Sequence, residues 1–415
     1  MQKILIRNID IDRWKKTGDR VIVYGRRKTG KTFFVSKFTE WNEFFFVKRD
    51  GGIFDLKNFK EISYDYLKDL LLKERGRIVV DEFHRLPADF LDFLQAFSEK
   101  MKVTLITSTL WLSKKILGEG SPILGLFEEF KIDLADERDV IFFLSEIEGK
   151  ELIDTAIYIR EPWMIPLLKT SVYEDIPRIL VEEKNTLERL IGEVFREEER
   201  ELKKTYASIL FAIALGKAKS SEISSHMYSR KLIQKDDPSL IQGYLKTLCN
   251  IGLIEKLQIL NKKFDLYQHK SPVLDLYFYL DAKYGFSDID LPEKEVKEVF
   301  MKKLPTHAEQ FFRNLFSKIF GLKAGKIIEK DYDVDIVLHS FKRITAVGEV
   351  KWKKFVEKEE VRRTEEILSK FKAKRFIVVP SKDVLEEIPR DVKVIDVETI
   401  KSNLKPKSSK QFSFF

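Results

Sequence analysis

The stretch VIVYGRRKTGKT, residues 21–32, decides the fold of the first part of this 415-residue chain. It opens with a short apolar run, continues as G-x-x-x-x-G-K-T, and is followed by the amphipathic segment FFVSKF. A short apolar run is typical of a buried strand, and an amphipathic segment is typical of a helix. The stretch therefore predicts a strand, a glycine-rich turn and a helix, the opening unit of an α/β domain.

The turn has the composition of a loop that binds the phosphates of ATP. Its two glycines let the backbone turn tightly, so that its N–H groups point at the phosphates, while Lys31 reaches the same phosphates and Thr32 offers a hydroxyl to Mg²⁺. The residues expected at this site are those of the whole loop, Gly25, Arg26, Arg27, Lys28, Thr29, Gly30, Lys31 and Thr32. The alternative is a degraded loop that binds nothing.

Two further strands are expected to complete this site. RIVVDEF, residues 77–83, ends in Asp81, which would hold Mg²⁺ through water, and Glu82, which would polarise the attacking water. KVTLITST, residues 102–109, reaches Ser108, where a polar sensor of the γ-phosphate would lie. Because Ser and Thr also end many strands without such a role, both interpretations of Ser108 stay open.

The segments GRRKTGKT, VVDEFHRLP, LITSTLWL and SPILGLFEEFKIDL resemble those of the archaeal ATPases in the signal-transducing (STAND-like) branch of the AAA+ enzymes. This resemblance implies a parallel-sheet ATPase core over residues 1–165, a helical lid over 166–204, and a family in which homo-oligomers occur. Two features depart from the family pattern. Leu126 stands after Gly125 where members commonly carry an arginine, and the usual N-terminal F-x-x-R-E motif is missing. These departures predict slow ATP turnover, with Arg138 as the candidate substitute for the arginine.

The middle of the chain has the pattern of a winged helix. Three helical segments, TYASILFAIALGK, SSEISSHMYS and PSLIQGYLKTLCNIGL, precede two strand-like segments, LIEKLQIL and KFDLYQHK, which together predict a winged helix-turn-helix over residues 205–286. The aromatic segment SPVLDLYFYLDAKYGF at its end is expected to be a core helix.

DNA is the partner expected for this unit. Gln242 and Lys246 on the third helix, and Lys262 and Lys263 at the tip of the wing, are the candidate contacts. Residues 201–270 contain 12 Lys and Arg against 6 Asp and Glu, and a local basic surplus is typical of a polyanion binder. Since the third helix lacks arginine, a lid or a protein-contact module remains the alternative. Solvated lysines of a thermophile-like composition would also explain the surplus.

The last third combines a charged linker helix, expected over residues 287–304, with a second α/β domain over 305–400. In its strand ITAVGEVKW, Glu349 and Lys351 share a face because residues i and i+2 of a strand point the same way. Asp335 is expected on the adjacent antiparallel strand. Two carboxylates in this arrangement can hold Mg²⁺ or Mn²⁺, and the lysine can position a water molecule, so the pattern predicts a phosphodiesterase site.

The run Gly348-Glu349-Val350-Lys351-Trp352 resembles the C-terminal domain of archaeal ATPases that has the PD-(D/E)xK nuclease fold. The resemblance implies catalytic roles for Asp335, Glu349 and Lys351. It also implies a metal shell made by Glu309 of the preceding helix together with Asp335 and Glu349. A non-cutting DNA-binding or dimerising module is the alternative.

Composition limits the remaining choices. The formal net charge is +8, and Cys249 is the only cysteine, so an intramolecular disulfide and a cysteine zinc site are excluded. No apolar run is long enough to cross a bilayer, and the N-terminus does not have the pattern of a signal peptide, so we expect no membrane partner and a cytoplasmic location. The five histidines are expected to lie mostly on the surface and to bind no metal. A basic tail, residues 401–415, carries four lysines and no acid.

The sequence thus predicts an α/β protein of three parts: an AAA+-like ATPase core with a lid, a winged helix, and a restriction-endonuclease-like domain. ATP would control DNA binding or cleavage. Three alternatives remain: a DNA-binding ATPase that does not cut, a STAND-type switch that oligomerises with ATP, and a nuclease in which the nucleotide is purely structural.

Overall fold

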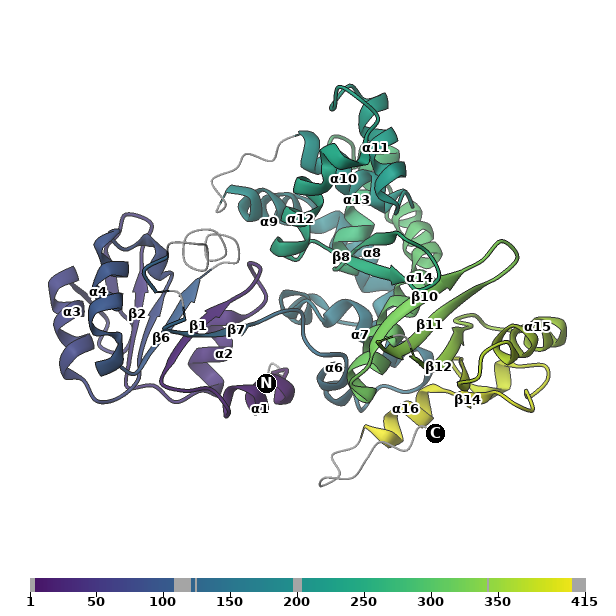
Figure 1. Ribbon diagram of the computed structural model, residues 1–415, viewed down its shortest axis with the longest axis horizontal. Helices are drawn as coiled ribbons and strands as arrows, with labels where there is room; N and C mark the ends of the chain where they lie inside the picture. Colours follow the sequence, from purple (N-terminus) through teal and green to yellow (C-terminus); the bar gives the residue numbers. More distant parts are fainter. Residues whose placement is uncertain (1–3, 108–120, 124, 197–203, 342, 405–415) are drawn as a thin grey trace.

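The computed structural model describes residues 4–107, 121–123, 125–196, 204–341 and 343–404, without the side chains of 193–196 (Figure 1). Two seven-stranded sheets, each mixing parallel and antiparallel pairs, build two bodies that lie side by side. We call residues 4–132 the first body and residues 135–404 the second body. Ser108 and most of the basic tail lie outside the described residues, so their predictions stay untested.

The first sheet has the strand order β4-β3-β2-β5-β6-β1-β7. Strands β2, β5, β6, β1 and β7 run parallel, and β3 and β4 join one edge antiparallel. The strands are β1 (Arg20–Tyr24), β2 (Glu43–Val47), β3 (Ile53–Asp55), β4 (Lys60–Ile62), β5 (Ile78–Asp81), β6 (Val103–Thr107) and β7 (Glu128–Lys131). The helices are α1 (Asn8–Trp14), α2 (Lys31–Phe38), α3 (Tyr64–Lys73) and α4 (Asp89–Phe97), with short 3₁₀ turns η1 (Phe83–Arg85) and η2 (Ser98–Lys100).

Both faces of this sheet are covered, because its central strands bury side chains on both sides. Along β1, Val21 and Val23 pack with Phe34 of α2 on one face. Ile22, which points the other way, packs with the cluster formed by α3 and α4. Alternate residues of a strand face opposite sides, and a parallel sheet is stable when helices cover both. The α/β core predicted from the phosphate-loop stretch is therefore present.

The second sheet has the order β14-β13-β12-β11-β10-β8-β9. Its strands are β8 (Ile254–Ile259), β9 (Asp265–His269), β10 (Lys323–Ile328), β11 (Asp333–Ser340), β12 (Arg343–Val350), β13 (Lys374–Val378) and β14 (Lys393–Ile395). The helices before its meander are α6 (Glu137–Phe143), α7 (Gly149–Ile159), α8 (Val172–Glu182), α9 (Lys184–Arg196), α10 (Lys204–Ala214), α11 (Ser220–Ser229), α12 (Gln242–Ile251) and α13 (Pro272–Tyr284). The remaining elements are α14 (Glu293–Phe320), α15 (Lys358–Ser369), α16 (Val397–Asn403) and the 3₁₀ turns η4 (Pro162–Leu167), η5 (Pro238–Ile241) and η6 (Lys382–Val384).

Helix α14 is the centre of the second body. Phe312 and Phe316 lie against the sheet, with ring centroids 4.9 Å from Trp352 and 5.1 Å from Phe376. Phe300, about three to four turns earlier, contacts Tyr158 of α7 with ring centroids 5.4 Å apart. The linker helix expected to end at residue 304 is therefore not separate, because the helix continues through Pro305. Apolar packing on both sides of Pro305 offsets the cost of about 3 kcal/mol that a proline imposes inside a helix.

The hydrophobic clusters also place the end of the first domain at a different residue from the one predicted. Helices α6, α7 and α8 share one apolar cluster with α14 and with one face of the second sheet. The sequence placed residues up to 165 in the ATPase core, but packing divides the chain near residue 133. The reason is that α6 and α7 bury their apolar faces against α14, and the first sheet is already covered by α2, α3 and α4.

The elements expected for residues 205–286 occur in the predicted order: three helices, a hairpin and a buried α13. One feature was not predicted. Strand β8 pairs in parallel with β10, so the β8–β9 hairpin is the edge of the second sheet. We call α10–α12 with this hairpin the helix–hairpin unit (residues 204–269).

The prediction that the histidines lie mostly on the surface is wrong. His226, His269, His307 and His339 are buried. Both ring nitrogens of His307 are bonded, to Tyr158 and Asp275. His226, His269 and His339 each keep one buried ring nitrogen that has no hydrogen-bond partner among the described residues. Among the described helices, none has both the length and the apolar character needed to cross a membrane.

The role of α14 gives a stability prediction. Phe312→Ala should lower the free energy of unfolding of the second body by about 3–5 kcal/mol, because it removes a fully buried ring and leaves a cavity between α14 and the sheet. Phe341→Ala, at a position that is 96% exposed, is the matched control and should change it by less than about 0.5 kcal/mol. Urea denaturation followed by circular dichroism measures both, and equal effects would contradict the central role of α14.

Candidate functional site

The loop predicted to bind phosphate joins β1 to α2 and is shaped by its two glycines. A Cβ at Gly25 would lie 1.9 Å from the carbonyl oxygen of Ile132, so only glycine fits where the loop passes the residue after β7. Gly30 adopts the left-handed conformation at φ 87° and caps the N-terminus of α2. Glycine adopts this conformation without the strain that a Cβ brings. The N-terminus of α2 therefore adjoins the loop, and the N–H groups of a helix's first turn are those that an anion site uses.

Lys31 and Thr32 occupy the first turn of α2. The buried ammonium of Lys31 donates to the carbonyl oxygens of Gly25 and Arg26 at 2.8 and 3.2 Å, which holds it inside the curve of the loop. Thr32 Oγ1 donates to Asp81 Oδ2 of β5 at 2.6 Å. The structure thus brings together the lysine, the hydroxyl and the acid that the sequence assigned to one site.

Asp81 fits the requirement for a magnesium ligand. Burial raises its pKa to about 6, against the effect of the hydrogen bond from Thr32. Its second oxygen, Oδ1, is buried and finds no hydrogen-bond partner among the described residues. A buried carboxylate oxygen without a donor is costly unless a cation or water meets it. Thr32 and Asp81 are the residues that would hold Mg²⁺ here.

Glu82 directly follows β5 in the left-handed conformation, with φ 58°. Its carboxylate lies 3.2 Å from the guanidinium of Arg85 and 3.6 Å from His84 Nε2. The other ring nitrogen of His84 bonds to Thr107 Oγ1 at 2.8 Å. A polar chain therefore runs from the end of β6 through His84 to Glu82, with a hydrogen bond as its first link and a 3.6 Å ion-pair contact as its second. Glu82 Oε2 has no hydrogen-bond partner among the described residues.

Thr107 is a site residue that the sequence analysis missed. The sequence analysis assigned the sensor to Ser108, which lies outside the described residues. Thr107 ends β6 directly beside Tyr24, the last residue of β1. The sequence did contain a signal for Thr107. It is the last residue of a central strand that lies next to β1, and the residue at that end of such a strand reaches the phosphate loop.

The side chains of Arg26 and Arg7 hold the phosphate loop in place. The guanidinium of Arg26 is only 4% exposed and bonds to both carboxylate oxygens of Glu161 at 2.5 and 2.6 Å. Arg7 donates to the carbonyl oxygen of Thr29 at 2.8 Å. The side chain of Arg26 anchors the loop to the segment after α7, so it is not available to a nucleotide. The prediction that Arg26 binds nucleotide therefore concerns only its backbone. Thr29 is also an anchor, since its buried hydroxyl donates to the Arg26 carbonyl at 2.7 Å.

Of the two remaining loop residues, Lys28 borders an apolar pocket. Arg27 is half-buried and Lys28 is exposed, at the mouth of the loop. A cavity of about 330 Å³ adjoins Lys28, Thr29 and Gly30. Its other walls are mostly apolar and include Ile4, Leu5, Phe33, Pro162, Trp163 and Ile165. The pocket thus adjoins the phosphate loop on one side and has apolar walls on the other.

The second predicted site lies in the second sheet. Ile336 of β11 pairs with Gly348 of β12, so Asp335 and Glu349, one position further, lie opposite each other. Glu349 Oε2 lies 3.2 Å from the ammonium of Lys351. Burial, followed by the charge of Asp335, raises the pKa of Glu349 to about 8. The acid–acid–lysine geometry predicted from the sequence is present.

A lysine that the sequence analysis did not single out also belongs to this cluster. Lys326 Nζ lies 3.0 Å from Asp335 Oδ1 and 3.0 Å from Glu309 Oε2. Burial acts to raise the pKa of Asp335, but the charge of Lys326 and the N–H of Val350 outweigh it and lower that pKa. Within the described part of the chain, no three His, Cys, Asp or Glu side chains are grouped closely enough to hold a metal ion. Glu309, Asp335 and Glu349 do not fit a metal as they stand.

Trp352, the last residue of the G-E-x-K-W run, bonds to a buried acid. Its indole N–H donates to Asp154 of α7 at 2.6 Å. Tyr173 and Lys150 also donate to the fully buried Asp154 carboxylate. Gly348 is required for another reason, since a Cβ there would lie 2.3 Å from the ring of Phe376. Both residues are structural.

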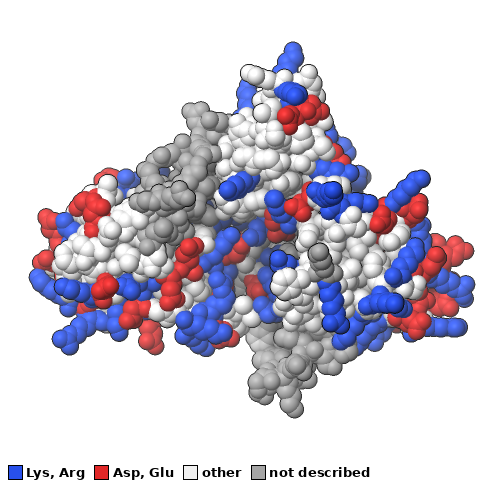
Figure 2. All heavy atoms as spheres, viewed as in Figure 1, with Lys and Arg blue, Asp and Glu red and all other residues white. Residues whose placement is uncertain are grey.

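The residues predicted to contact DNA lie in two places on the helix–hairpin unit. Gln242 and Lys246 are both exposed on α12, at i and i+4 and therefore on one face. Lys262 and Lys263 are exposed in the turn between β8 and β9, but Lys262 is paired with Glu329 at 3.1 Å. Figure 2 shows basic and acidic side chains interspersed over both bodies on the face it presents. The positive charges of this face therefore do not form one continuous stripe.

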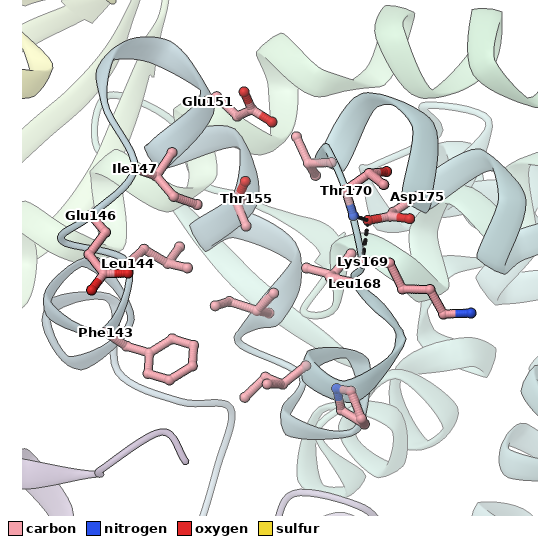
Figure 3. A pocket seen from close by; sticks show the side chains of 14 residues that line it. Phe143, Leu144, Glu146, Ile147, Glu151, Thr155, Leu168, Lys169, Thr170 and Asp175 are labelled. Carbon is pink, nitrogen blue, oxygen red and sulfur yellow. Dashed lines mark hydrogen bonds between the residues drawn. The ribbon is translucent and has the colours of Figure 1, made fainter. Parts of the chain in front are cut away.

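Another cavity, of about 470 Å³, lies between α6, α7, η4 and α8 (Figure 3). Its acids already have structural partners. Asp175 accepts from the N–H groups of Lys169 and Thr170, and Glu151 accepts from Ser171. These contacts hold the residues before α8 in place and tie the start of α8 to α7, so the cavity lining has a structural role.

No known protein-family model matches the chain. An uncharacterized protein of Methanocaldococcus jannaschii is 20% identical over 380 residues, which cover 80% of this chain and 82% of that protein. Among solved structures, the Walker-type ATPase PABY2304 of Pyrococcus abyssi is 17% identical with a TM-score of 0.45, covering 66% of this chain and 96% of that one. The Aeropyrum pernix ORC2 protein, solved as ADPNP–ADP complexes, is 13% identical with a TM-score of 0.36, covering 72% and 92%. At these values, the functional assignment rests on the geometry of the sites.

The Arg26–Glu161 pair gives a second prediction. Glu161→Leu should lower the free energy of unfolding by about 3–5 kcal/mol, because it leaves the buried Arg26 charge without a partner. The double variant Arg26→Met with Glu161→Leu should recover much of this loss, since no charge remains to be compensated. Denaturation of the wild type, both single variants and the double variant completes the cycle. Additive losses in the double variant would show that the two side chains act independently.

Proposed function

We propose that this chain binds and hydrolyses ATP at the loop between β1 and α2. The observation that carries the proposal is the contact of Thr32 with Asp81 beside the buried Lys31 and the orphaned Asp81 oxygen. This set is what a P-loop site needs: a cation for the phosphates, and a hydroxyl and an acid for the metal. Magnesium would neutralise phosphate charge when bound. Thr32 and Asp81 would hold it.

The apolar pocket beside the loop supports a nucleotide rather than a free phosphate. Its position next to Gly30 places a dry surface near the end of a phosphate chain bound by the loop. Trp163 and Phe33 among its walls offer aromatic faces for a purine ring. Ligand pockets of this kind are mostly apolar with a few polar groups at one end.

Glu82 and its neighbours would perform the hydrolysis. Glu82 would polarise the attacking water as general base, a role that requires hydrogen-bond reach of that water. Thr107 and His84 form the polar chain that ends at Glu82, and we assign them to positioning it. Leu126, which stands where the resembled ATPases commonly carry an arginine, predicts that turnover is slow.

The Arg26–Glu161 anchor supports a coupling of nucleotide to the second body. Glu161 belongs to the segment that joins α7 to η4, and α7 packs in the core of the second body. A phosphate that changes the loop would therefore act on α7, and through Asp154 and Trp352 on the second sheet. We propose that the helix–hairpin unit, as a winged helix, contacts DNA through α12. The alternative is a STAND-type switch that oligomerises with ATP and contacts protein.

Metal-dependent cleavage of DNA by a PD-(D/E)xK-like second body is the second candidate function. Asp335 opposite Glu349, with Lys351 two residues further on the same strand, supports it. Mg²⁺ or Mn²⁺ could join these acids only if the ammonium of Lys326 left Asp335. A second body that binds DNA without cutting it is consistent with Lys326 as it lies.

Two substitutions test the ATPase proposal. Lys31→Ala should weaken ATP binding by about 10- to 100-fold, because it removes a charge-assisted contact to phosphate. Glu82→Gln should keep ATP binding and lower hydrolysis by at least about 100-fold, because the general base is lost. Titration calorimetry and phosphate release measure the two effects. Lys37→Ala, an exposed lysine on the same helix, is the control, and an equal loss in that variant would contradict the assignment.

DNA contact through the helix–hairpin unit has its own test. Replacing Lys246 and Lys263 by Ala should weaken binding to duplex DNA at all sequences. The slope of log affinity against log salt should also fall by about 2, since roughly 0.9 counterion is released per phosphate contact. Lys73→Ala on the first body is the control and should leave both quantities unchanged. DNA binding that is insensitive to the α12 and hairpin lysines would favour the protein-contact alternative.

A further inference from the structure

The acidic cluster of the second sheet already contains a cation. The ammonium of Lys326 bridges Asp335 Oδ1 and Glu309 Oε2, each at 3.0 Å, and lies 3.7 Å from Asp333. The side chain is only 13% exposed. Distances of this size are those of charge-assisted hydrogen bonds. Lys326 thus occupies the place between the strand acid and the helix acid.

The other oxygens of the cluster are largely engaged as well. Asp335 Oδ2 accepts from the N–H of Val350 at 3.0 Å, and Glu349 Oε2 accepts from Lys351 at 3.2 Å. Glu349 Oε1 is buried and finds no hydrogen-bond partner within the described residues. A divalent ion that took up this free oxygen would lie close to two lysine ammonium groups.

The charges of the cluster balance without a metal. Its acids are Glu309, Asp335 and Glu349. Its cations are Lys326, Lys351 and the buried Arg313, which donates to the carbonyl oxygen of Asp335 at 3.0 Å. Among these six side chains, three formal negative charges meet three positive ones. Asp333, 3.7 Å from Lys326, and Glu360, 3.5 Å from Lys351, add negative charge at the more exposed edge of the cluster. Adding a doubly charged ion would leave a net positive charge in a buried place, which the low effective dielectric makes unfavourable.

The backbone holds Lys326 where it is. Strand β10 lies between β11 and β8, and Lys326 pairs with Ile259 of the hairpin. The N–H of Leu260 donates to the Lys326 carbonyl at 3.0 Å. Strands on both sides of β10 restrain the Lys326 backbone, which lies where the β10–β11 ladder shifts register between Gly325 and Ile327.

We propose that Lys326 is the resident cation of this site and excludes divalent metal ions from Asp335, Glu309 and Glu349. The second body of the wild-type chain is then a metal-free, non-cutting module, and removal of the lysine charge unmasks a metal site. This inference does not rest on the ATPase proposal, because it concerns a different body and is tested without nucleotide.

The test is a count of bound Mn²⁺ on the full chain by electron paramagnetic resonance, without nucleotide. Wild type and Asp335→Asn should bind the same number of ions. Lys326→Met should bind one more ion per chain, with an affinity at this site at least about 100-fold above that of wild type, because a like charge a few ångströms away is removed. The extra ion should disappear in Lys326→Met with Asp335→Asn. Lys326→Arg, which keeps the charge, should behave as wild type.

Two results would overturn the proposal. In one, wild type binds an ion that Asp335→Asn loses, so the site takes metal in spite of Lys326. In the other, Lys326→Met folds, as judged by circular dichroism, and gains no ion. If Lys326→Met does not fold, Lys326→Gln takes its place with the same expectations. The comparison of wild type with Asp335→Asn uses no Lys326 variant and decides the matter if neither variant folds: equal counts support the proposal, and a lower count in Asp335→Asn refutes it.

Discussion

The second body depends on the long helix α14, because several of its groups can be buried only against it. One stretch of α14 places Phe312 and Phe316 against the sheet, and an earlier stretch places Phe300 against α7. The same helix carries Glu309 and Arg313 into the acidic cluster. A helix that is buried along so much of its length is fixed in rotation and translation, since shifting it would expose rings and unpair charges together. The position of the cluster is thus set by packing.

The two candidate sites follow a common rule of buried charge. A charged group removed from water must be paired, and each site meets this rule with the chain's own cations. Lys31 donates to loop carbonyl oxygens and Arg26 to Glu161, whereas Lys326 bridges Asp335 and Glu309. The two sites differ in the surroundings of the carboxylate oxygens that remain without a partner. Asp81 and Glu349 each keep a buried oxygen without a hydrogen-bond partner among the described residues. Asp81 lies beside the hydroxyl of Thr32, which fits a metal, whereas Glu349 lies in a cluster whose Lys326, Lys351 and Arg313 already supply positive charge.

Local patterns in the sequence were sufficient to predict many features of this protein. The phosphate loop, the Asp81 strand, the order of elements in the helix–hairpin unit, and the pairing of Asp335 opposite Glu349 all follow from spacing within short segments. The features that were missed depend on contacts distant in sequence. Nothing near Pro305 shows that its helix continues, because the packing that stabilises it comes from α7, α13 and the sheet. Glu161 lies 135 residues from Arg26, and Lys326 gains its meaning only when β10 is placed beside β11.

The hairpin β8–β9 connects the two parts of the second body that the sequence treated as separate domains. It belongs to the helix–hairpin unit by chain order, yet it pairs with β10 at Gly325 and Lys326. Asn261 in its turn donates to the Ile328 carbonyl at 3.1 Å, and Lys262 pairs with Glu329, so the hairpin tip is tied to the far end of β10 as well. A partner that pulled on the hairpin turn would therefore apply force to β10, the strand that carries Lys326. Loss of the β8–β10 pairing would remove one of the two strands that restrain the Lys326 backbone. The fold thereby joins the surface expected to meet DNA to the charge that keeps metal out of the acidic cluster.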